Sequence, residues 1–196
     1  FSQYDNLPKK FSDFLIAQVA AKVAQKTEQN IWQGATANAG EFNGFQALLA
    51  ADGDVVDVTG TTLSAANIIA ELGKVVNAIP SAVYGKEDLK IYIPTSAAKF
   101  YIQAQAALGY RELYHVGQTD MNFQGIPLFT ASGLGADKMV AAESSNLFFG
   151  TGLLNDWQEV KLIDMADIDG SQNVRVVLRG SAGVQHGIGG DIVLYS

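Results

Sequence analysis

The sequence feature that most constrains the fold is the stretch of residues 11–32, which contains neither glycine nor proline. At about 100° per residue along a helix, its polar residues share one stripe. These polar residues are Gln18, Lys22, Gln25, Lys26 and Gln29. The other side carries mostly small apolar residues, namely Ile16, Ala17, Val19, Ala20, Val23 and Ala24. The pattern predicts one long helix laid across a sheet, although an ordinary amphipathic core helix has the same pattern.

Composition restricts the classes of protein to which the chain can belong. The 196 residues include no cysteine, which excludes disulfides, thiolate metal sites and a cysteine nucleophile. The chain carries 13 basic and 20 acidic side chains, a net charge of -7, which argues against general nucleic-acid binding by charge attraction. Only 17% of the residues are charged, below the usual quarter. We therefore expect much of the surface to be hidden in an assembly.

The chain carries no signal for a membrane span or a secretory leader. It has no apolar run of 18 or more residues, the length at which a span is considered. It begins with Phe1, and no basic segment precedes an apolar run. We expect the chain to be processed, or to be a fragment of a longer protein.

The middle of the chain alternates helical and extended patterns. In chain order we expect a helical turn at 45–51, a strand at 54–59, a helix at 65–79, a strand at 88–94 and a helix at 97–108. Ser64 suits the N-cap of the second of these helical segments, and Pro80 ends it. Gly109 follows the third at the C′ position, where a left-handed residue commonly closes a helix. A strand between two helices predicts an α/β middle section.

After residue 110 the pattern changes to short apolar runs separated by turn residues. We expect strands at 125–130, 138–142, 158–165, 173–179 and 191–195. Residues 145–152, with Leu147, Phe148 and Phe149, are predicted to form a buried turn or a short helix. The strands at 158–165 and 173–179 are joined through Asp169 and Gly170 into a hairpin. This hairpin is predicted to pack on the helix at 11–32, while the middle section forms a separate lobe.

Candidate chemical groups are few. The two histidines, His115 and His186, stand in no metal-ligand spacing and are interpreted as structural. Two acidic clusters consist of Asp52, Asp54 and Asp57, and of Asp164, Asp167 and Asp169. Neither cluster fits a calcium loop, so both are interpreted as solvated turns, with cation binding at a subunit contact as the alternative. We assign no catalytic, cofactor-binding or metal-ligating residue and no cofactor, because nucleophile-elbow and Walker A motifs are absent.

The order of these segments resembles a known family. An alanine-rich helix ends in NIWQG, and FNGF and the helix before Pro80 follow. Next come LKIYIPTS at 89–96, FQGIPL at 123–128, NLFFGTG at 146–152 and the terminal hairpin. This run resembles the major capsid protein of tailed bacteriophages, the Hong Kong 97-type fold, over nearly the whole chain from residue 11 onwards. The resemblance rests on segment order and local sequence rather than on a catalytic motif.

The resemblance implies an α+β fold with two domains. Residues 1–33 and 156–182 would form the peripheral domain, in which a long spine helix packs on an elongated β-hairpin sheet. Residues 34–155 and 183–196 would form an α/β axial domain, with the loops at 81–88 and 110–121 as axial contacts. The family also carries an N-terminal arm and an extended loop before the spine helix, and little more than ten residues precede that helix here. We therefore expect a truncated or protease-matured chain.

The resemblance implies a structural virion protein rather than an enzyme. It would be made in the bacterial host cytoplasm and would self-assemble through pentamers and hexamers into an icosahedral shell. The shell would enclose double-stranded DNA without sequence-specific contact, with scaffolding, portal or decoration proteins as further partners and no membrane partner. An encapsulin-type compartment shell around a cargo enzyme is the alternative. A third hypothesis is an α/β enzyme or ligand-binding domain with an unrecognised site.

Overall fold

A computed structural model describes residues 6–109, 121–152, 160–165, 170, 174–178 and 180–196. Its helices are α1 (Asn6–Gln33), α2 (Phe45–Ala51), α3 (Ile68–Ala78) and α4 (Thr95–Ala107). The first strands are β1 (Val56–Val58), β2 (Leu89–Ile93), β3 (Asn122–Phe123), β4 (Ile126–Thr130) and β5 (Met139–Glu143). The remaining strands are β6 (Leu147–Thr151), β7 (Val160–Asp164), β8 (Val174–Leu178), β9 (Ala182–His186) and β10 (Val193–Tyr195). The predicted mixture of helices and strands is confirmed.

Within the described residues, six strands form one sheet in the order β1-β10-β5-β2-β4-β3. The pairs β1–β10 and β2–β4 are parallel, and the other pairs are antiparallel. Ile91 at the centre lies between Leu128 of β4 and Ala141 of β5. Both faces of the sheet are covered, because the alternate residues of its central strands enter two different hydrophobic clusters. We call this sheet with α2, α3 and α4 the body.

Helices α3 and α4 cover one face of the sheet, where they enclose the larger cluster around Ile91 and Met139. The last turn of α1 and helix α2 cover the other face. There the Trp32 ring lies 5.4 Å from Phe45 and 5.2 Å from Tyr92, measured between ring centroids. Trp32 therefore joins the end of α1 to the sheet.

Helix α1 begins five residues earlier than residue 11, at Asn6. The helix therefore extends beyond the predicted stretch of residues 11–32 at its N-terminal end. Pro8 is compatible with helix there because the first amides of a helix have no intrahelical acceptor to lose. In the part of the chain that the structure describes, no helix is long and apolar enough to cross a membrane.

Helix α3 begins at Ile68 rather than residue 65, and its N-cap is Asn67 rather than Ser64. The Asn67 side-chain oxygen accepts hydrogen bonds from the Ser64 amide, at 2.7 Å, and the Ser64 hydroxyl, at 3.0 Å. These local hydrogen bonds stabilise a turn at residues 65–67, which helix propensity alone would place in the helix. The end of α4 agrees with the prediction, because Gly109 follows it with φ of +75°.

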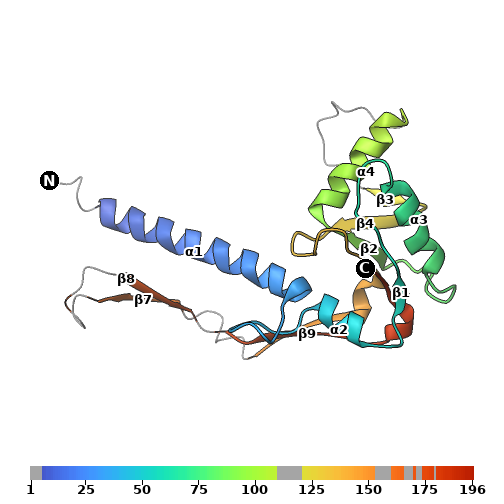
Figure 1. Cartoon of the computed structure of the whole chain (residues 1–196). Helices are drawn as coiled ribbons and strands as arrows, with labels where there is room; N and C mark the ends of the chain where they lie inside the picture. The colour runs from blue at the N-terminus through green and yellow to red at the C-terminus, as the bar shows by residue number, and fades with distance from the viewer. Residues whose placement is uncertain (1–5, 110–120, 153–159, 166–169, 171–173, 179) are drawn as a thin grey trace.

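Helix α1 and the β7–β8 hairpin project from the same side of the body and run alongside each other (Figure 1). We call these two elements the arm. The predicted hairpin is confirmed, with Val160 paired to Leu178 and Asp164 to Val174. Strands β6 and β9 pair antiparallel from Leu147–His186 to Thr151–Ala182 and connect the hairpin with the body (Figure 1).

The prediction of a buried turn or short helix at residues 145–152 is wrong. A 3-10 turn at Ser144–Asn146 leads into β6, and Phe148 and Phe149 are 55% and 47% exposed. Successive residues of a strand point to opposite faces, so the two rings lie on opposite sides of a ribbon whose partner β9 was also not predicted. The hydrophobic side chains of this segment indicated that it would be buried, but no other described part of the same chain covers the two rings.

Candidate assembly surfaces

Helix α1 is largely uncovered over the part of the arm nearest its start. No described side chain from Phe14 to Lys26 is buried, although most of these residues are apolar. Ile16, Val19, Val23 and Thr27 form a half-buried stripe, whereas Phe14 is 64% exposed. The predicted polar edge, from Gln18 to Gln29, is exposed throughout. Apolar surface of this extent on a projecting helix is typical of an interaction surface.

Three glycines hold the other end of α1 against the body. A Cβ atom at Gly133 would lie 2.1 Å from the backbone oxygen of Glu28, and one at Gly34, which directly follows α1, would lie 2.3 Å from the backbone oxygen of Phe42 in the loop before α2. A Cβ at Gly44 would lie 2.6 Å from the backbone oxygen of Asn30. The Gln33 side-chain amide donates to the Gly133 carbonyl at 2.6 Å. The missing side chains thus let two loops touch the helix backbone directly.

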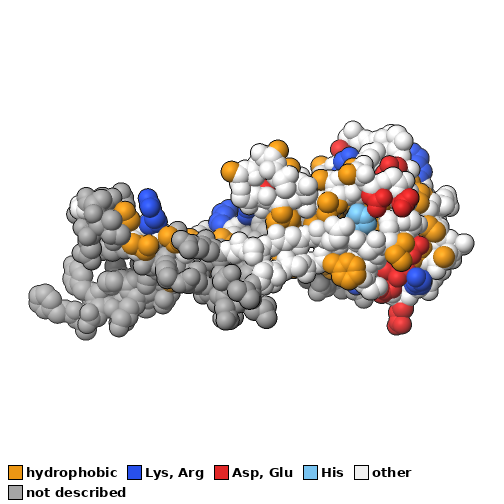
Figure 2. All heavy atoms as spheres, turned by 90° about the horizontal axis from the view of Figure 1, so that it is seen from below, with side chains coloured by type: hydrophobic (Ala, Val, Ile, Leu, Met, Phe, Trp, Pro, Cys, Tyr) orange, Lys and Arg blue, Asp and Glu red, His pale blue; other side chains and the backbone are white. Residues whose placement is uncertain are grey.

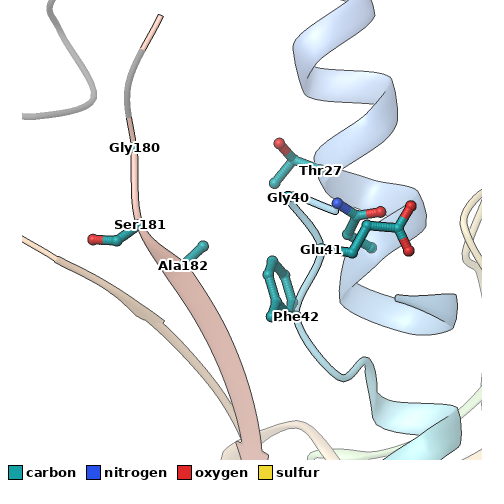
Figure 3. A pocket seen from close by; sticks show the side chains of 8 residues that line it. Thr27, Gly40, Glu41, Phe42, Gly180, Ser181 and Ala182 are labelled. Atoms are coloured by element: carbon teal, nitrogen blue, oxygen red, sulfur yellow. The ribbon is translucent and has the colours of Figure 1, made fainter. Parts of the chain in front are cut away.

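A polar cavity of about 240 Å³ lies where α1, the loop before α2 and the start of β9 converge. Figure 3 shows Thr27, Glu41 and Phe42 on one wall and Ala182 facing Phe42 from the other. Asn30 also lines this cavity, and its buried Oδ1 atom accepts no hydrogen bond from the described residues. The cavity is a small polar gap at the junction of arm and body, and nothing in its lining selects a ligand class.

Glu41 fastens the loop of this cavity to α1. Its carboxylate accepts hydrogen bonds from Lys26 at 2.6 Å, from the Asn38 side chain at 2.9 Å and from the Ala35 amide at 3.3 Å. The bond from Lys26 is the main cause that lowers the pKa of Glu41 from 4.5 to about 2. The carboxylate therefore stays charged at any pH at which the protein is normally handled.

A pH dependence follows from this depressed pKa. A carboxyl whose pKa is lower in the folded state stabilises the fold above its unfolded pKa, and the contribution is lost as pH falls through the folded pKa. For Glu41 that window runs from pH 4.5 down to about 2. Urea denaturation should show Glu41→Gln less stable than wild type at pH 7, and the difference should shrink across this window. Lys26→Met should reproduce the effect, and a pH-independent difference would contradict the assignment.

The connecting ribbon presents a second apolar surface. Ile188, just after β9, is 64% exposed, and it lines a groove of about 300 Å³ together with Phe148. We call this the Ile188 groove, and its lining residues are Lys86, Glu143, Ser145, Asn146, Phe148, Gly187, Ile188 and Asp191. Figure 2 shows acidic side chains on the body. The groove thus combines an apolar wall with charged neighbours.

The groups singled out from the sequence as candidates for chemistry have structural partners. His186 is buried, and its Nε2 lies 2.7 Å from Oδ2 of Asp52. The hydrogen bond with His186 is the first cause that lowers the pKa of the Asp52 carboxyl. Asp52 also accepts the Asp54 amide at 3.0 Å, so these two residues form a turn after α2. The third member of the cluster, Asp57, is exposed but lies in strand β1, so the prediction of a turn is wrong there. No group of three metal-ligating side chains occurs among the residues with described positions.

Other candidates fall partly outside the described residues. His115, Asp167 and Asp169 lie there, as do residues 110–120 of one predicted axial loop. The side chain of Asp164 is likewise not described. The other predicted axial loop, residues 81–88, is mostly exposed.

Comparisons with known proteins show which fold this is. The chain is similar to the capsid of an empty GTA particle, at 14% identity and a TM-score of 0.65, over 94% of this chain and 65% of the other. It is similar to a structure from Mycobacterium phage Che8, at 13% identity and TM-score 0.53, over 90% of this chain and 60% of the other. A structure from Gordonia phage Cozz matches at 14% identity and TM-score 0.52, over 100% of this chain and 66% of the other. No protein-family model and no curated protein matches the chain.

The chain therefore has the Hong Kong 97-type fold of phage major capsid proteins, as its segment order predicted. Within that fold α1 is the spine helix, and the β7–β8 hairpin runs alongside it. The chain spans less than two thirds of the length of these three structures.

Proposed function

We propose that this chain is a structural subunit of an icosahedral capsid shell, the major capsid protein of a tailed phage, rather than an enzyme. The observation that carries the proposal is the uncovered arm. From Phe14 to Lys26 the spine helix has a mostly apolar surface and no buried described side chain. A projecting element of this kind gains its cover from neighbouring subunits. The fold shared with capsid subunits supports the same conclusion.

The low charge of the chain agrees with this role. Only 17% of the residues are charged, and large aromatic side chains such as Phe148 are exposed on the connecting ribbon. Surfaces buried in subunit contacts need fewer charges, because interface cores are depleted of them. We propose that residues 1–33 and 156–182 act as the peripheral domain, and that residues 34–155 and 183–196 meet at the five-fold and six-fold centres.

The proposed partners are other copies of the chain, in pentamers and hexamers. Packaged double-stranded DNA would be enclosed without sequence-specific contact, which suits a chain with a net charge of -7. Scaffolding, portal or decoration proteins would act during assembly, and the shell would be the virion's outer layer. The protein would be made in the host cytoplasm.

Negative-stain electron microscopy and sedimentation velocity test the proposal. We expect closed shells, and a protein that stays strictly monomeric at high concentration would overturn the proposal. Particles isolated from the source should contain nuclease-protected double-stranded DNA. Particles that enclose protein in place of DNA would assign the shell to the encapsulin type instead.

A further inference from the structure

We propose that the Ile188 groove receives the Phe14 end of α1 from a second copy of this chain. The proposal rests on the proposed function, since it assigns one of the contacts that would build the shell. Both surfaces are apolar, and both are uncovered within one chain. Phe14 and Ile188 are each 64% exposed, the largest value among the exposed large apolar side chains that are described.

The exposure of Ile188 is built into the fold. The Asn146 side chain donates to the Ile188 carbonyl at 2.9 Å and accepts the Ile188 amide at 2.8 Å. The preceding residue is Gly187, where a Cβ atom would lie 2.6 Å from the Asn146 oxygen and 3.3 Å from the Phe148 ring. This two-point clamp fixes the loop that carries Ile188 at the rim of the groove, beside Phe148. A rigid apolar pair of this kind suits an anchor residue from a partner.

The charges around the groove favour a partner with basic character. Lys86 forms a salt bridge with Glu143 and also interacts electrostatically with Asp191 and Asp88, so a single cation faces three carboxylates. Asp88 lies beside the groove, where it accepts the hydroxyl of Ser145 at 2.6 Å. Lys86 is the sole basic residue in the lining. The groove therefore presents net negative charge next to its apolar wall.

Helix α1 has the complementary surface. The stretch from Lys9 to Gln25 carries three basic residues, Lys9, Lys10 and Lys22, and one acidic residue, Asp13, so it is net basic. Lys22 is exposed. At 1.5 Å per residue, Lys22 lies roughly 12 Å along the helix from Phe14, close enough to accompany it to the same neighbour. An aromatic anchor in a stretch with more basic than acidic residues thus matches a groove with two apolar side chains and excess acid.

One chain cannot make this contact with itself. Phe14 stands roughly 28 Å along α1 from the anchored end at Gln33, at 1.5 Å per residue. The arm projects away from the body, and the groove lies where the connecting ribbon meets the body (Figure 1). The contact is therefore between different patches on two copies. A contact of this type closes into rings when its rotation permits, as five-fold and six-fold assemblies require.

Cysteine cross-linking tests the contact, because the chain has no cysteine of its own. Phe14→Cys and Ile188→Cys are produced separately, mixed under assembly conditions and treated with a short bis-maleimide cross-linker. We expect a covalent dimer that contains one copy of each variant. The matched control mixes Phe14→Cys with Leu108→Cys, because Leu108 is similarly exposed, at 57%, but lies after α4. Cross-linking should be at least tenfold weaker in the control.

Two outcomes separate this inference from the proposed function. Shells that form normally while the two mixtures cross-link equally would overturn the contact and leave the shell proposal standing. Protein that remains monomeric would overturn both. A second variant, Ile188→Ser, changes only an exposed side chain and should leave the fold intact while it lowers shell yield at least tenfold. Wild-type shell yield in Ile188→Ser would contradict the contact.

Discussion

Gly133→Ala is expected to destabilise the protein by roughly 1–3 kcal/mol, the usual cost of forcing extra atoms into a packed site. The added Cβ would meet the backbone oxygen of Glu28 at 2.1 Å and the backbone nitrogen of Gln29 at 2.9 Å. All of these neighbouring atoms belong to the backbone of α1, so no flexible side chain can move aside. The loop that carries residue 133 must therefore move away from α1. Urea denaturation should show the loss of stability. Amide exchange should rise in the last turns of α1.

Gly53→Ala is the matched control for this substitution. A Cβ atom at Gly53 meets nothing within 4 Å, so the change should stay within about 0.5 kcal/mol of wild type, as is usual for surface substitutions. Equal stability of Gly133→Ala and Gly53→Ala would show that the loop does not hold the helix. Because the arm is positioned from this end, we also expect Gly133→Ala to reduce shell yield more than its stability loss alone explains.

Tyr195→Phe is the second substitution for which we expect a large effect. The fully buried Tyr195 hydroxyl accepts the Thr61 amide at 2.9 Å and donates to a Glu71 oxygen at 2.8 Å. Glu71 is itself buried and keeps Lys74 as its ionic partner at 2.8 Å. The phenylalanine would leave the Thr61 amide without its acceptor, at a cost of roughly 1–3 kcal/mol. For a chain of this size the melting temperature should fall by roughly 2–10 °C.

Tyr84→Phe removes the same hydroxyl from a tyrosine that is 51% exposed. Its melting temperature should match that of wild type, because water replaces the lost interaction. A wild-type melting temperature for Tyr195→Phe would show that the buried network around Glu71 contributes nothing to stability.

The sequence predicted the elements whose burial is supplied within one chain. The apolar positions of α3 follow a helical period because they pack on the sheet, and the strands at β2 and β5 are apolar because both of their faces are covered. Helix α1 and the hairpin β7–β8, which lie in the arm, were predicted from their simple periodic patterns alone. Segment order was enough to indicate the capsid fold.

The surfaces could not be predicted in the same way. Phe148 and Phe149 have a sequence typical of buried residues, and only the structure shows them on an exposed ribbon. The presentation of Ile188 depends on Asn146, 42 residues away, and the partner of His186 is Asp52, 134 residues away. Contacts at such separations leave no periodic signal in a single sequence.

The division between a packed body and an arm with little cover has a thermodynamic consequence. Anything that binds only the folded subunit raises its apparent stability by mass action, and in the proposed shell neighbouring copies would act as that ligand. The melting temperature of the assembled particle should therefore depend on subunit concentration, whereas that of the body should not. Heating should release amide protection in α1 before it reaches the central strands around Ile91. The spine helix would then be fully stabilised only when neighbouring subunits of the shell cover it.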